Sequence, residues 1–67
     1  MFMLVSDLLE YRSYITDNTV IYIRRNGRQL FEGYRSDDSI LQYQHFAVAD
    51  FFFNPAVGVD SIFIILK

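Results

Sequence analysis

Two runs of the sequence are apolar at every position, namely "FFF" at 51–53 and "IFIIL" at 62–66. A β-strand places neighbouring side chains on opposite faces, so each run presents large apolar groups on both faces. A sheet with one face in water instead alternates apolar and polar residues. We therefore expect a sheet that contains these two runs to have both faces hidden from water.

The chain has few means of stabilising a small core. Its 67 residues form one domain, 1–67, and at this size folding hides only about 60% of the surface that the open chain exposes. It has no cysteine for a disulfide or a thiolate metal site, which suits the cytoplasm, and zinc is not expected because His45 is its only histidine. An apolar content of 52%, rich in Phe and Tyr, excludes disorder and leaves hydrophobic burial as the main source of stability.

The pattern along the chain predicts an α+β fold. Ser6 and Asp7 are typical of a helix start, and apolar residues at helical spacing extend the predicted helix over about 4–14. β-Branched and aromatic residues predict strands at 19–25, 28–34, 46–53 and 61–67, with a short helix within 35–44 and a turn at Asn54-Pro55 and Gly58. We expect the N-terminal helix to pack on a small four-stranded, mainly antiparallel sheet.

Asn26-Gly27 joins the first two predicted strands, and two turn geometries fit it. One is a two-residue type I′ loop, and the other is a three-residue loop with glycine in the left-handed conformation. The two-residue loop sets Ile23 opposite Leu30 but also sets Arg25 opposite Arg28, which is a like-charge pair. The sequence leaves both registers open.

Charge is unevenly distributed within the formal total of −2. Arginines gather around the predicted hairpin, whereas the second half of the chain is acidic. One interpretation is that a charged tip only keeps the hairpin soluble. The other is a protein-binding site, because Arg and Tyr are enriched at interfaces. Its candidate residues are Tyr22, Arg24, Arg25, Arg28, Tyr34 and Arg35.

No set of residues in the sequence points to a reaction, a cofactor or a metal. His45 begins a predicted strand without a partner nucleophile, and Asp37-Asp38 is typical of a helix cap. The glycines are isolated and form no phosphate-binding loop. No apolar run reaches the length of a membrane span, and the acidic turn at Asp7 argues against a signal peptide. We therefore expect a non-catalytic protein without cofactors.

A single predicted helix can cover only one face of the predicted sheet. The second face could be covered by the loop at 36–44, by a second copy of the chain or by a partner protein. Because a core this small gains from further burial, we expect a homodimer. The candidate residues for the self-associating, aromatic face are Phe51, Phe52, Phe53, Phe63 and Ile65.

The order of the segments "SDLLEYR", "VIYIRRNGRQLFEG", "SILQY", "VADFFFN" and "SIFIILK" resembles that of short proteins encoded by phages and mobile elements of Gram-positive bacteria. Some small phage proteins of this kind inhibit host defence, anti-CRISPR proteins among them. The resemblance implies an accessory protein that binds a host protein in the host cytoplasm. The alternative is a nucleic-acid-binding accessory or regulatory protein that uses the arginine-rich tip, although a net acidic chain does not favour it.

Overall fold

The computed structural model describes residues 3–11, 15–56 and 59–67. Within them the chain forms a short helix α1 (Val5–Leu9), strands β1 (Val20–Arg25) and β2 (Arg28–Gly33), a 3-10 helix η1 (Asp38–Tyr43), and strands β3 (Val48–Ala56) and β4 (Val59–Leu66). The predicted α+β fold with a four-stranded sheet is confirmed, whereas the predicted helix-first arrangement and mainly antiparallel pairing are confirmed only in part. Gly58 and residues 12–14, to which the helix prediction extended, lie outside the described residues.

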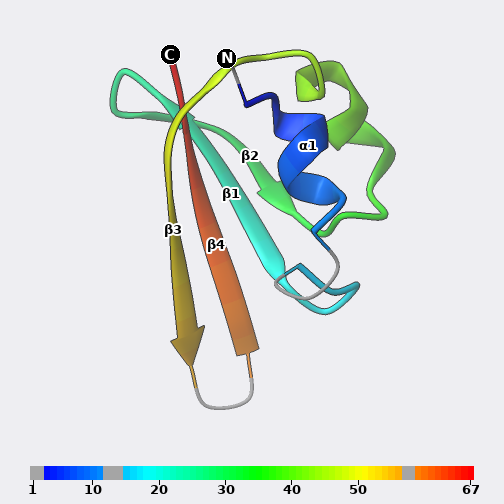
Figure 1. Ribbon diagram of the computed structural model, residues 1–67. Coiled ribbons are helices and arrows are strands. Elements are labelled where there is room, and N and C mark those ends of the chain that lie inside the picture. Colours follow the sequence, from blue (N-terminus) through cyan, green and yellow to red (C-terminus); the bar gives the residue numbers. More distant parts are fainter. Residues whose placement is uncertain (1–2, 12–14, 57–58) are drawn as a thin grey trace.

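The four strands form one mixed sheet in the order β2-β1-β4-β3 (Figure 1). The β1/β2 and β3/β4 pairs are antiparallel, whereas the central strands β1 and β4 are parallel. The sheet thus consists of two hairpins joined through a parallel central pair. The sequence did not predict this pairing.

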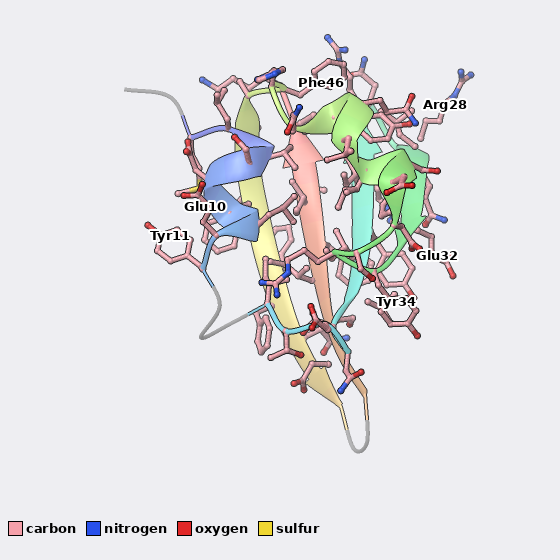
Figure 2. All side chains as sticks on the ribbon, turned by 90° about the vertical axis from the view of Figure 1, so that its right-hand side faces the viewer. Glu10, Tyr11, Arg28, Glu32, Tyr34 and Phe46 are labelled. Carbon is pink, nitrogen blue, oxygen red and sulfur yellow. The ribbon has the colours of Figure 1, made fainter. Side chains whose placement is uncertain are left out.

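Both helices lie on the same face of the sheet (Figures 1 and 2). From α1, Val5 and Leu8 enter the core, and Ile40 enters it from η1, so that all three belong to one cluster with the buried side chains of the sheet. The segment at 36–44 therefore covers the same face of the sheet as α1. Of the three ways in which the second face could be covered, the one by the loop at 36–44 is therefore wrong.

The ends of several elements differ from the predictions for identifiable reasons. Leu4, not Ser6, occupies the N-cap position of α1, and the Asp7 carboxylate accepts a hydrogen bond from the Leu4 N–H at 2.9 Å. The helix ends with Glu10 as its C-cap, so Ile15 is buried without being helical. Strand β3 continues through Asn54 to Ala56, because pairing with β4 outweighs the turn preference of Asn54-Pro55 at the edge of a sheet.

The hairpin adopts the two-residue turn. Asn26 and Gly27 both have positive φ, at 53° and 77°, as a type I′ turn requires. Arg25 consequently pairs with Arg28. A bulge at Leu30 then shifts the register by one residue, and Ile23 pairs with Phe31. The Ile23–Leu30 pair that a regular two-residue hairpin would form is therefore absent, and Phe31 is the β2 side chain that is buried with Ile23.

Candidate protein-binding face

The face of the sheet opposite the helices carries aromatic side chains on its two central strands. Ile21 and Ile23 of β1 are buried against the helices, as are Ile62, Ile64 and Leu66 of β4. Since a strand alternates its faces, the residues between them point the other way. They are Tyr22 and Arg24 of β1 and Phe63 and Ile65 of β4. We call this surface the open face.

One row of paired residues crosses the open face and is aromatic at three of its four positions. Glu32 pairs with Tyr22, Tyr22 with Phe63, and Phe63 with Phe52, so the row spans all four strands. The Tyr22 and Phe63 rings stack with their centroids 4.7 Å apart and their planes at 11°. Phe52, at the β3 end of the row, is 56% exposed. The row is a preformed apolar strip with an acidic residue at one end.

The neighbouring row adds charge of both signs. Arg24 pairs with Gln29 on one side and Ile65 on the other, and Ile65 pairs with Asp50. The Arg24 guanidinium carbon lies 5.3 Å from the centroid of the Phe63 ring, which is within cation–π range. This contact holds a positive charge above the aromatic strip, while Asp50 contributes a negative charge towards the β3 edge.

The four arginines that the sequence placed in one candidate site divide into three groups. Arg24 belongs to the open face. Arg25 and Arg28 are exposed at the tip of the hairpin, where with Asn26 and Leu30 they line an open hollow of about 410 Å³. Arg35 follows β2 at its other end, next to Tyr34, which Figure 2 shows far from Arg28.

Arg35 has a structural role. Its guanidinium donates hydrogen bonds to the Leu9 carbonyl at 3.4 Å, to the Ile15 carbonyl at 3.1 Å and to the Asp17 carboxylate at 2.9 Å. Its side chain is only 19% exposed. It therefore joins the end of α1 to the segment that leads into β1. These contacts account for Arg35 without a binding partner.

The candidate aromatic face also divides in two. Phe52, Phe63 and Ile65 share the open face, whereas Phe51 and Phe53 pair with Ile64 and Ile62 and point to the helix side. There they line an apolar pocket of about 340 Å³, together with Met3, Leu8, Tyr11, Ile15 and Ile62. The three consecutive phenylalanines are thus divided between the open face and the apolar pocket on the helix side.

The other residues that the sequence singled out either have a structural role or lie apart from the open face. The Asp37 carboxylate accepts a hydrogen bond from the Tyr34 N–H at 2.7 Å, and Asp37 is the N-cap of η1. Tyr34 itself is 45% exposed and His45 is exposed. Among the described residues, no three acidic, His or Cys side chains are grouped to hold a metal ion.

Sequence reasoning missed two features of this surface. Glu32 and Asp50 enter the open face only through the strand order and register, which place them at its two sides. The apolar pocket arises because α1 ends at Leu9 and leaves Phe51 and Phe53 partly uncovered. No local pattern in the sequence predicts either feature.

Comparison with known protein families, curated proteins and solved structures finds no match for this chain. In the part of the chain that the structure describes, no helix has the length and apolar character needed to cross a membrane.

Proposed function

We propose that this protein is a non-catalytic binding module that docks on another protein through the open face of its sheet. One observation carries the proposal, namely that both helices cover the same face of the sheet. On the other face they leave a row of half-buried Tyr22 and Phe63 and exposed Phe52. Soluble monomers rarely expose an apolar patch of this kind without a use for it.

The composition of the open face resembles that of a protein interface. Aromatic residues and Arg supply most of the binding energy at interfaces, and they concentrate near the centre within a polar rim. Here Tyr22, Phe63 and Arg24 lie on the central strands, while Glu32 and Asp50 lie on the outer ones. Because Tyr22 and Phe63 already stack on each other, little side-chain freedom is lost when a partner binds.

The charges indicate the chemistry of the partner. Arg24 belongs to the open face, and Arg25 and Arg28 follow it at the hairpin tip, so positive charge collects at one end of the surface. A partner that places an apolar patch on the aromatic row and acidic groups against this end would be complementary in both respects. We propose an acidic host protein as this partner.

A binding module of this kind fits the phage or mobile-element accessory class that the sequence resembles. A small protein without catalytic residues can inhibit an enzyme simply by covering its surface. We propose that this chain acts in the host cytoplasm as an inhibitor of a defence system, of the anti-CRISPR type. Expression in a bacterium with an active CRISPR system should then restore infection by a targeted phage, and open-face variants should not restore it.

Two variants test the open face away from its β3 edge. Arg24→Glu reverses the central charge, and Tyr22→Ser removes one ring of the stack. Both should abolish protection of the phage while leaving the circular dichroism spectrum unchanged. Leu41→Ser is the control, because Leu41 is an exposed apolar residue, at 56%, that lies on η1 on the helix side of the sheet. Equal protection by all three variants and the parent would refute the proposal.

The alternative function is nucleic-acid binding through the hairpin tip, which the exposed pair Arg25 and Arg28 favours. Phosphate binding by these few charges would be weak, insensitive to sequence and strongly dependent on salt. The double variant Arg25→Glu/Arg28→Glu should then eliminate binding of a generic single-stranded oligonucleotide, whereas Tyr22→Ser should retain it. Under the protein-binding proposal, the parent shows no oligonucleotide binding at physiological salt.

A further inference from the structure

The open face carries two opposite charges that do not meet within one chain. Arg24 and Asp50 belong to the same row, but Ile65 lies between them on β4. Both are exposed, and among the described residues neither forms an ion pair. Arg24 lies over the Phe63 ring, and Asp50 accepts a hydrogen bond from the Phe51 N–H at 2.8 Å through one carboxylate oxygen. A charge from outside the chain can therefore still reach both groups.

The apolar positions of the open face are incompletely covered. Tyr22, Phe63 and Ile65 are half-buried, and Phe52 is exposed. A sheet with such a face commonly packs on a second sheet about 10 Å away, with the strand directions within about 30° of each other. A second copy of the chain supplies a sheet of the same width with the same apolar row.

Two-fold symmetry offers two ways of placing one aromatic row on the other. With the axis along the row, across the strands, each residue faces its own copy, so Glu32 faces Glu32. With the axis parallel to the strands, between β1 and β4, the row faces its reversed copy. Tyr22 then faces Phe63 of the second copy, and Phe63 faces its Tyr22. Because like charges in apposition are unfavourable, the second arrangement is preferred.

The same rotation brings the opposite charges together. In the neighbouring row, β4 of the second copy lies over β1 and its β3 lies over β2. Arg24 consequently faces Ile65 of the second copy, and Asp50 of that copy lies next to it, over Gln29. Symmetry repeats the contact, so two Arg24–Asp50 pairs flank the apolar centre. The open face is thus complementary to itself in its charges as well as in its aromatic row.

The size of the open face limits the strength of this contact. Four strands at about 4.8 Å each are about 19 Å wide, and the six residues of β1 extend about 20 Å. The footprint of about 400 Å² per copy is about half of the surface that each partner buries in a standard stable interface. We therefore expect a reversible association.

We propose that two copies of this chain associate through their open faces, with the two-fold axis parallel to the strands. The two sheets then form a sandwich with the helices on its outer sides, because both helices cover the opposite face of each sheet. This dimer hides the aromatic row in the free protein, and a host protein that docks on the open face would replace the second copy. The association does not depend on the proposed function, since it concerns the protein alone.

Sedimentation equilibrium tests the association. From micromolar to millimolar concentration, the mass of the parent should rise from the chain mass of 7.9 kDa towards twice that value. A parent that remains monomeric at millimolar concentration overturns the proposal. Because no host protein is present, a monomeric parent that still protects the phage overturns only the dimer. A dimeric parent that never protects the phage overturns only the proposed function.

Charge reversal tests the arrangement. Arg24→Glu and Asp50→Lys each create two like-charge pairs in a homodimer, so each should weaken the association by about tenfold or more. A mixture of the two variants restores both pairs and should associate more strongly than either variant alone. Arg28→Glu and Asp38→Lys are the matched controls, because they change the net charge equally but lie at the hairpin tip and on η1. Each control should dimerise like the parent.

A double variant separates the ion pairs from effects of the single changes on the fold. Arg24→Glu/Asp50→Lys keeps the net charge of the parent and restores both pairs in the reverse sense. It should associate more strongly than either single variant, and circular dichroism verifies the fold of all three. If neither the mixture nor the double variant associates more strongly than the single variants, the arrangement is wrong and the proposal falls.

Discussion

Replacing Arg35 by Ala tests whether this arginine is part of the scaffold or of a binding site. Its hydrogen bond to the Ile15 carbonyl is a charged one between partly buried groups and contributes about 1.5–3 kcal/mol. The ion pair with Asp17 adds at most about 1 kcal/mol, because the Asp17 side chain is 77% exposed. The 3.4 Å contact with the Leu9 carbonyl contributes little. We therefore expect Arg35→Ala to lower the free energy of unfolding by about 2–4 kcal/mol.

That loss is a large part of what a chain of 67 residues can have, about 3–10 kcal/mol. Urea denaturation followed by circular dichroism measures it directly, and the melting temperature should fall by about 10 °C or more. Asp17→Asn is the control, since it removes the ion pair but keeps the carbonyl contact, and should cost about 1 kcal/mol or less. A stability of Arg35→Ala within about 0.5 kcal/mol of the parent would refute the structural role.

Three further substitutions test the strands and turns. Gly33→Ala should destabilise the domain by about 1–3 kcal/mol in urea denaturation, because its Cβ would overlap the Asp37 carboxylate that holds Tyr34. Gly27→Val should lower the free energy of unfolding by about 1–2 kcal/mol, because Gly27 has a φ of +77°, which a β-branched residue adopts only with strain. An unchanged melting temperature would show that residue 27 does not have this backbone conformation. Arg28→Glu should stabilise the domain by about 0.2–1 kcal/mol, because it turns the like-charge pair of residues 25 and 28 into an opposite-charge pair. Most of this gain should disappear in 1 M salt.

Local patterns in the sequence were enough to predict the strands and the hairpin turn. β-Branched and aromatic residues bounded by turn residues predicted four strands, and Asn26-Gly27 predicted the first turn, since both positions need positive φ. Each of these features depends on residues that are close together in the chain.

Features that depend on distant residues could not be predicted in this way. The parallel pairing of β1 with β4 is set by which hairpin edges meet, and no local pattern encodes that choice. Arg35 was assigned to the hairpin tip because it is close to it in sequence. The strand β2 carries it to the far end, and only the fold brings it to Leu9 and Ile15. The open face arose in the same way, since the position of η1 decides which side of the sheet remains uncovered.

The place of β4 at the centre of the sheet has a consequence for how the chain folds. Val20 pairs with Ser61, so the central ladder closes a loop that contains most of the chain. Each hairpin can form early because its contacts are local, but the sheet is complete only when the two hairpins dock. Topologies with such long-range contacts fold slowly, and this docking should be the rate-limiting step. During synthesis the first hairpin, with α1 and η1, has to wait for the last strand before its core can close.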